Sequence, residues 1–204
     1  TLDPYAEGVL PIAINKTTKL IPFVNSNSKK YIFKIKWREQ TLTDDAEGKI
    51  INYSNKIPAI DEISNIIYSF LGDTYQIPPK ASAVKVNGKR AYSILRDQKN
   101  FKLKPKKVFL KQILFLGSNN DTSEFSIECG KGYYVRSLAR DIAEKLGTFG
   151  HIIELKRKKV GNFDYKRSIL LDDLLKIRQS ELEFNYIHSS ISMLDDILAY
   201  EVEE

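Results

Sequence analysis

The sequence predicts an α+β domain built on a mostly antiparallel sheet. Residues 29–37, 106–116 and 123–129 are rich in β-branched and aromatic residues, and apolar residues at helical spacing occur between and after these segments. Strands and helices mixed in this order are typical of the α+β class. The 204 residues, 42% of them hydrophobic, can bury a full core as one large domain or two small ones.

The predicted strands begin close to the N-terminus. Residues 9–14 form an apolar run punctuated by glycine and proline, which predicts a short buried strand. Residues 29–37 partly alternate between apolar and polar side chains, which favours β structure. Residues 41–48 are acidic and turn-like. Two later strands are predicted over 106–116 and 123–129.

Helices are predicted where apolar residues recur at spacings of three and four. One such face covers residues 60–71 and another covers 135–146, and each is followed by a glycine that can end a helix. Between them, Pro78-Pro79 breaks the chain and introduces an extended segment. Shorter helices are predicted over 89–96 and from residue 171 onward.

Charge and cysteine content narrow the class of protein. The net charge of +6 favours a polyanionic partner, although basic clusters such as 102–107 and 156–159 also serve as solvated faces. One cysteine, Cys129, excludes a disulfide within the chain and, with two histidines, is too little for a typical zinc cluster. We therefore expect a reducing, intracellular setting. No apolar run approaches the roughly 20 residues that span a membrane.

A single acid, Asp3, stands directly before Pro4. A residue before proline is disfavoured in the helical region, so Asp3 is expected on a turn or in an extended segment. An acid on a turn that leads into a strand can be held rigidly at the edge of a cleft. The same residue can also do no more than cap its own turn.

Five sequence blocks follow one another along the chain: TLDPYAEGVLP at 1–11, KY at 30–31 running into QTLTDDAEG at 40–48, QIPPKASAVKVNGKRAY at 76–92, GKGYYVRSLARD at 130–141, and LKR at 155–157 with VGNF at 160–163. In content, order and spacing these blocks resemble the TruB-type tRNA pseudouridine synthases, and the first block is similar to the catalytic motif of that family. The resemblance extends almost to the end of the chain.

The resemblance implies the pseudouridine synthase fold, a curved, mixed and mainly antiparallel sheet with flanking helices and an RNA cleft across it. It also implies that the uridine at position 55, in the tRNA T-loop, is isomerised to pseudouridine without a cofactor or metal. The target base would have to be flipped out of the RNA stack. We expect the partner to be the tRNA T-arm, and the protein to act as a cytoplasmic monomer away from membranes.

The resemblance assigns three catalytic residues. Asp3 is the carboxylate, with its role as nucleophile or base left open. Arg136 is expected to hold Asp3 ionised, because a guanidinium is always charged and can bind a carboxylate through two parallel hydrogen bonds. Tyr31 is expected to stack on the flipped uracil. Taken alone, Arg136 is also compatible with a structural ion pair and Tyr31 with core packing.

Six further residues are expected to bind the substrate. Tyr134 matches a family tyrosine near the target base, Leu155 matches a leucine of the pocket wall, and Lys19 matches a basic family position. The other three, which we call the insertion cations, surround a glycine in the proline-rich block: Lys85, Lys89 and Arg90. Flexible cations of this kind bind phosphate rather than read bases, although a basic loop also aids solubility.

The acids of the second block, Asp44, Asp45 and Glu47, have too few neighbouring ligands for a metal and are expected to form an acidic turn.

The chain begins without methionine, inside its first block. By resemblance, residues 1–204 are expected to be a catalytic domain that lacks an N-terminal segment and the family's C-terminal RNA-binding PUA domain. Two alternative functions are compatible with the same sequence blocks. The protein could act as a guide-RNA-dependent pseudouridine synthase, like archaeal or eukaryotic relatives, or as a tRNA-folding chaperone that binds RNA without required catalysis. The Leu-Pro-Ile-Ala-Ile and Asp-Asp-Ala-Glu-Gly segments favour the bacterial tRNA enzyme.

Overall fold

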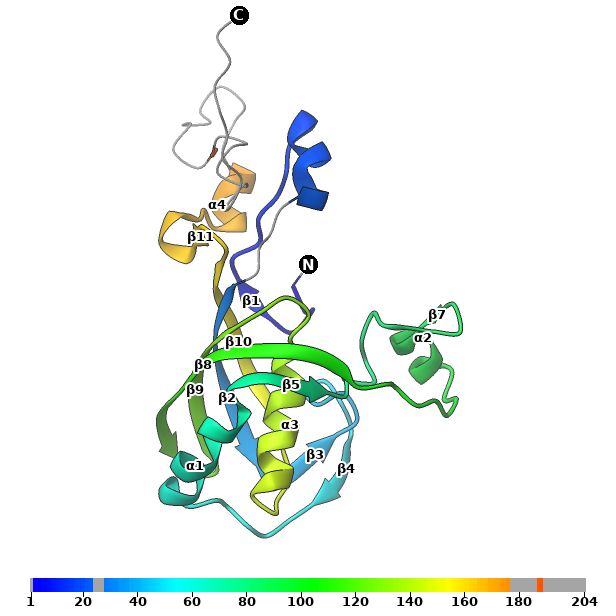
Figure 1. The fold of residues 1–204 in the computed structure, drawn as a ribbon, viewed down its shortest axis with the longest axis vertical. Helices are drawn as coiled ribbons and strands as arrows, with labels where there is room; N and C mark the ends of the chain where they lie inside the picture. Colours follow the sequence, from blue (N-terminus) through cyan, green and yellow to red (C-terminus); the bar gives the residue numbers. More distant parts are fainter. Residues whose placement is uncertain (1, 24–27, 177–186, 189–204) are drawn as a thin grey trace, which may run out of the picture.

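One large sheet forms the body of the protein in the computed structural model, which describes residues 2–23, 28–176 and 187–188 (Figure 1). Its strands lie in the order β1 (Glu7–Gly8), β10 (Gly150–Val160), β2 (Lys29–Trp37), β9 (Thr122–Cys129), β8 (Lys106–Asn119) and β5 (Gly72–Gln76), with β11 (Phe163–Asp164) paired to β10. Neighbouring strands are antiparallel except β1, which is parallel to β10. The predicted mixed, mainly antiparallel sheet is confirmed.

Strand β2 forms at the centre of the sheet because its side chains alternate. The inward-facing residues are at most 9% exposed: Tyr31, Phe33, Ile35 and Trp37. Phe33 lies opposite Phe125 of β9, and the two rings stack with centroids 5.4 Å apart. Full burial of one such side chain stabilises the fold by about 1.5–3 kcal/mol. The strand predicted over 29–37 therefore anchors the core.

Two helices cover one face of the sheet (Figure 1). Helix α3 (Val135–Lys145) packs on β10 and β2, whereas α1 (Ile60–Ile67), extended by η2 (Tyr68–Phe70), packs on β8 and on α3. Their inward residues, such as Ile63, Leu138 and Ile142, are fully buried. The helices predicted over 60–71 and 135–146 are confirmed, and α3 holds its N-terminal end at the edge where the site forms.

Two smaller hairpins lie outside the main sheet. Strands β3 (Glu39–Thr41) and β4 (Ile50–Tyr53) flank the expected acidic turn. The insertion, residues 82–105, carries β6 (Lys85–Val86), β7 (Lys89–Arg90) and α2 (Ala91–Arg96), and it projects to one side of the sheet (Figure 1). The helix predicted over 89–96 thus begins only at Ala91, because the two residues before it pair with β6.

Three short helical segments lie at the end of the sheet where the chain leaves β10 (Figure 1): η1 (Asn15–Phe23), η3 (Tyr165–Arg167) and α4 (Leu171–Lys176). The helix predicted from residue 171 is confirmed. Over the three described ranges, no helix has the length and apolar character needed to cross a membrane.

The strand predicted over 9–14 is wrong. Pairing with β10 ends at Gly8, and the Val9 amide makes one further hydrogen bond to the Arg157 carbonyl. Of the apolar run only Val9 is buried, and Ile12 is 69% exposed. Pro11 has no N–H to continue a ladder, so the segment leaves the sheet.

Strand β10 was absent from the sequence-based prediction although it pairs with β1, β2 and β11. Its charged segment Lys156–Lys159 hides the apolar alternation, and its register to β2 shifts twice, after Ile152 and after Arg157. Each shift moves the following side chains to the opposite face, so the period of two is lost.

Candidate functional site

The first turn of α3 places a buried arginine between two carboxylates. Arg136 is 6% exposed; its Nη2 lies 2.6 Å from Asp3 Oδ2, and its Nη1 lies 2.9 Å from Asp45 Oδ2. The same nitrogens donate to the carbonyl oxygens of Ala81 at 3.1 Å and Thr43 at 2.9 Å. The expected Arg136–Asp3 contact is therefore present. The expected pair of parallel bonds to one carboxylate is not, because the guanidinium is shared between two acids.

Asp3 lies on a turn that is tied to β10. The amide three residues later donates to the Asp3 carbonyl at 2.9 Å, and the Tyr5 hydroxyl donates to the Ile153 carbonyl at 2.6 Å. Gly8, with φ of 110°, then lies opposite Arg157, and a Cβ at this position would collide with the Arg157 carbonyl. The predicted turn at Asp3 is confirmed, and its close approach to β10 fixes the carboxylate at the sheet edge.

Two opposing effects act on the Asp3 carboxyl group. Burial raises its pKa, whereas the charge and hydrogen bond of Arg136 lower it, and burial prevails, so that the pKa lies above its ordinary value. The charge of Asp45 raises the pKa of Asp3 further. Arg136 favours the ionised acid, as expected, but offsets only part of the cost of burial. The Asp3 side chain remains 23% exposed and can be reached from solvent.

The acidic turn between β3 and β4 supplies the second partner of Arg136. Asp45 is 2% exposed, and its Oδ1 accepts hydrogen bonds from the Thr43 hydroxyl and from the amide two residues later. Its neighbour Asp44 binds Arg140 at 2.9 Å, one helical turn beyond Arg136. Both acids thus pair with arginines of α3. Sequence reasoning missed the role of Asp45; the available signal was two adjacent acids in one block and two arginines four apart in another.

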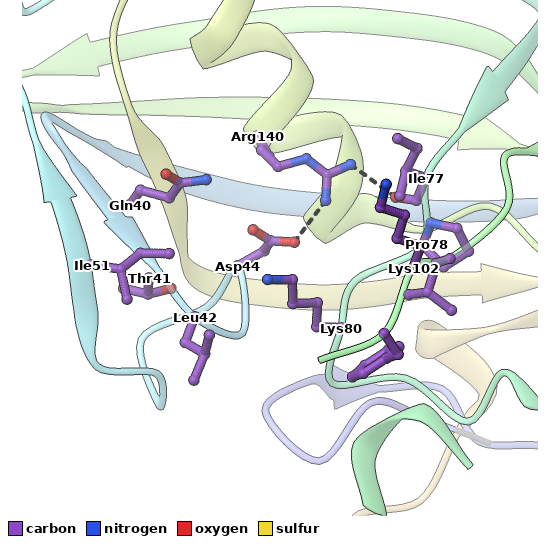
Figure 2. Close-up of a pocket in the computed structure, with 12 residues that line it drawn as sticks. Gln40, Thr41, Leu42, Asp44, Ile51, Ile77, Pro78, Lys80, Lys102 and Arg140 are labelled. Atoms are coloured by element: carbon purple, nitrogen blue, oxygen red, sulfur yellow. Dashed lines mark hydrogen bonds and ion pairs between the residues drawn. The ribbon is translucent and has the colours of Figure 1, made fainter. Parts of the chain in front are cut away.

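A cavity of about 430 Å³ opens beside this turn (Figure 2). Its apolar lining includes Leu42 and Ile51 of the β3–β4 hairpin together with Pro78 and Phe101. Lys80 extends into the cavity on the side where Asp44 lies (Figure 2). Apolar walls with a few charged groups are typical of ligand pockets, but neither Asp3 nor Arg136 is among the residues that line this cavity.

Asp44, which lines this cavity, is a second acid with a raised pKa. Burial raises the pKa of Asp44 to about 6, against the lowering effect of Arg140 and, more weakly, Arg136. Arg140 also donates to the carbonyl of Ile77 at 2.8 Å, so the Asp44–Arg140 pair joins the acidic turn, α3 and the segment after β5.

Tyr31 combines core packing with a hydroxyl group that is hydrogen-bonded to Arg157. It is 9% exposed, and burial raises the pKa of its hydroxyl while a hydrogen bond from Arg157 lowers it. The charge of Asp3 also acts on this hydroxyl. Arg157 is itself 4% exposed and donates from Nε to the Val9 carbonyl at 2.8 Å. Arg157 is a second residue that sequence reasoning missed, because a buried arginine has no signature inside a basic run.

Tyr134 and Leu155, the two predicted residues of the base pocket, lie in different environments. Tyr134 is the half-buried residue directly before α3; burial raises the pKa of its hydroxyl, with Arg136 lowering it and Asp3 raising it. Leu155 lies on β10 opposite Phe33, is 5% exposed and belongs to the hydrophobic core. The structure thus brings Tyr134 within electrostatic range of Asp3, whereas Leu155 is a buried residue of the hydrophobic core.

The remaining predicted residues lie apart from this centre. Lys19 is exposed on η1, and the insertion cations are exposed on β6 and β7. Arg90 donates to the Ala83 carbonyl at 2.6 Å, within the insertion itself. Between these four cations and either Asp3 or Arg136, no hydrogen bond or ion pair forms among the described residues.

Among the described residues, no group of three or more His, Cys, Asp and Glu side chains is placed so that it could hold a metal ion. Cys129 is buried on β9, and burial raises the pKa of its thiol to about 12. Its predicted core position is confirmed.

Two family models match the chain in succession. Residues 1–135 match the TruB family pseudouridylate synthase (N terminal domain), and residues 136–199 match the tRNA pseudouridylate synthase B C-terminal domain. The tRNA pseudouridine synthase B of Ehrlichia ruminantium (strain Gardel) is 42% identical over 205 residues, which cover 97% of this chain and 69% of the relative. That of Rickettsia bellii (strain OSU 85-389) is 40% identical over 206 residues, covering 100% and 70%.

The chain spans only part of the proteins it resembles. It covers 50% of the Wolbachia pipientis tRNA pseudouridine synthase B, at 43% identity over 178 residues. Among solved structures, a Cbf5-Nop10-Gar1 complex gives a TM-score of 0.70 at 23% identity, covering 95% of this chain and 51% of that one. An H/ACA RNP bound to a substrate RNA gives a TM-score of 0.67 at 20% identity, with coverages of 95% and 50%. These structural likenesses concern the fold.

Proposed function

Because the chain belongs to the TruB family of pseudouridylate synthases, we propose that it isomerises a uridine of tRNA to pseudouridine. The observation that carries the proposal is the pair of Asp3 and Arg136, whose side chains meet at 2.6 Å where α3 begins. A partly buried carboxylate with a guanidinium partner is the charged group that this isomerisation requires.

In the proposed reaction, the bond between ribose C1′ and uracil N1 breaks, the detached base turns, and C1′ bonds to C5. The proton on C5 is lost and N1 gains one, so the change is an isomerisation that consumes no cofactor. Asp3 either attacks C1′, through a bond that breaks again when C1′ bonds to C5, or removes a ribose proton that is returned before the product forms. Both roles need the ionised carboxylate, which Arg136 favours and burial disfavours.

We infer that the substrate uridine lies in the T-loop of the tRNA T-arm and is flipped out of the stack. Extrusion costs about a few kcal/mol, and least for a base that is already exposed in a loop. Tyr134 and Tyr31 would contact the flipped base, with Leu155 in the pocket wall. Lys19 and the insertion cations would bind phosphates, since all four are exposed.

We further infer that the protein acts in the cytoplasm and that it acts as a monomer. A single buried cysteine is compatible with a reducing compartment. Sedimentation of the purified protein with and without tRNA would test the oligomeric state.

The proposal is tested with an unmodified tRNA transcript and no guide RNA. Carbodiimide labelling followed by primer extension should reveal pseudouridine at one T-loop position. Asp3→Asn should abolish the label yet retain most tRNA affinity, because affinity is distributed over phosphate contacts. Modification only after a guide RNA is added would support the guide-dependent alternative. Binding of tRNA without any pseudouridine would support a folding chaperone and overturn the proposal.

A further inference from the structure

Helix α3 begins without a capping side chain of its own. Its N-cap residue, Tyr134, makes no side-chain cap hydrogen bond, although the first turn of a helix leaves backbone N–H groups without helical partners. Gln76, the last residue of β5, lies 58 positions earlier in the chain. Its Oε1 accepts the Tyr134 N–H at 3.0 Å, and its Nε2 donates to the Tyr134 carbonyl at 3.2 Å. One side chain thus holds both backbone groups of the residue that starts α3.

The chemistry of this contact is specific to a carboxamide. Gln76 is 2% exposed, so its polar atoms depend on protein partners. A glutamine offers a neutral donor and an acceptor side by side, whereas an ionised glutamate can only accept and an apolar side chain can do neither. Asparagine has the same end group on a chain one methylene shorter. Few side chains could replace Gln76 without loss of one or both bonds.

The residues after Gln76 continue the attachment to α3. The Ile77 carbonyl accepts the Ser137 hydroxyl at 2.8 Å and Arg140 Nη2 at 2.8 Å. The Ala81 carbonyl accepts Arg136 Nη2, the same nitrogen that contacts Asp3. We call residues 76–81 the tether. Both the backbone at the start of α3 and the guanidinium of Arg136 are therefore held by the tether.

We propose that Gln76 is a positioning residue for the uridine isomerisation, because it fixes the start of α3 at the place where Arg136 meets Asp3. This inference rests on the proposed function. Arg136 is two residues from the backbone that Gln76 holds, and a displacement of about 1 Å near reacting groups can cost roughly 100-fold in rate. Loss of the contact should therefore slow the chemical step, whereas tRNA affinity depends on the exposed cations elsewhere.

Two substitutions of Gln76 separate positioning from general stability. Gln76→Met fills the space but removes both bonds, and it should lower the single-turnover rate at saturating tRNA about 10- to 100-fold with little change in Kd. Gln76→Glu should be similarly slow near neutral pH. Its rate relative to wild type should then rise as the pH falls, because a protonated carboxyl group again offers a donor and an acceptor. Burial raises the pKa of such a group, so the recovery should begin at a higher pH than the ordinary pKa of a glutamate would give.

The matched control is Ser137→Ala. It removes one hydrogen bond between the tether and α3 but leaves the contact of Gln76 with Tyr134 intact. Ser137→Ala should lower the melting temperature without a comparable loss of rate. Equal rate losses in Gln76→Met and Ser137→Ala, or a Gln76→Glu rate ratio that stays flat with pH, would overturn the proposal.

A crystal structure of Gln76→Met gives a readout that does not depend on activity. The Arg136–Asp3 separation should exceed the 2.6 Å of the native protein, and an unchanged separation would contradict the positioning role. Failure of the wild-type protein to modify tRNA would count against the proposed function instead, and this structural comparison would then decide the role of Gln76.

Discussion

Replacing Arg136 with lysine tests whether the shape of the guanidinium, beyond its charge, sustains the site. Arg136 reaches oxygen atoms of Asp3, Asp45, Thr43 and Ala81 from two nitrogens in one plane. A lysine ammonium carries its donors on a single nitrogen and cannot reproduce the planar fork that contacts the two carboxylates from two separate nitrogens. One charge-assisted hydrogen bond contributes about 1.5–3 kcal/mol, and 1.36 kcal/mol corresponds to about tenfold in rate. Loss of the Asp3 contact alone should therefore slow isomerisation about 10- to 200-fold.

Arg140→Lys is the matched control for this substitution. Arg140 lies one turn further along α3 and also pairs with a buried acid, Asp44, but it does not contact Asp3. Single-turnover rates at saturating tRNA, measured by carbodiimide labelling, should fall for Arg136→Lys and stay within a few fold of wild type for Arg140→Lys. Thermal melting should show both variants destabilised. A rate for Arg136→Lys within twofold of wild type, or equal losses in both variants, would refute the reasoning.

Two further predictions concern the base and the phosphates. Tyr31→Phe should keep the ring in the core and lose the hydroxyl contact with Arg157, whereas Tyr31→Ala should also lose stacking, about 1–3 kcal/mol per base. Single-turnover rates should therefore fall in the order wild type, Phe, Ala, and wild-type activity in the alanine variant would make Tyr31 purely structural. Replacing all three insertion cations by alanine should reduce the slope of log Kobs against log salt by about 2–3. The rate at saturating tRNA should change much less; an unchanged slope with a collapsed rate would instead indicate a role in assembling the site.

The parts of the fold that could be predicted are those whose signal is local. The strand over 29–37 alternates enough to be recognised because one of its faces is buried, and α3 shows an apolar stripe because it lies on the sheet. Strand β5 was missed because Gly72–Gln76 has only five residues and its apolar pattern is weak. The segment 9–14 has the composition of a buried strand, yet only Val9 is covered.

The candidate site likewise has residues that the sequence could predict and partners that it could not. Asp3 could be placed on a turn because the proline after it restricts its backbone, and Arg136 could be placed at the start of a helix. The partners that hold them come from far along the chain: Asp45 lies 91 residues before Arg136, and Gln76 lies 58 before Tyr134. No period or spacing relates such positions, so their roles become visible only when the tertiary structure brings them together.

Asp45 has two opposite effects on Asp3, and they can be separated by pH. It orients Arg136 through a contact of 2.9 Å, which should raise the rate, but its charge raises the pKa of Asp3. Asp45→Asn should therefore lower the plateau of the single-turnover rate, because Arg136 loses a partner. It should also move the acid limb of the pH–rate profile to lower pH, because Asp3 is then ionised at lower pH, and the ionised form is the reactive one.

The height of the plateau and the pH of the acid limb can be read independently from one pH–rate profile. A lower plateau with an unmoved acid limb would mean that Asp3 does not set that limb. A limb that moves to lower pH with an unchanged plateau would mean that Asp45 acts on Asp3 by charge alone and does not orient Arg136. Glu47→Gln is the matched control, since Glu47 is exposed and its charge also raises the pKa of Asp3, but by less than the charge of Asp45 does. It should move the limb less than Asp45→Asn and leave the plateau intact, because its side chain makes no contact with Arg136 among the described residues.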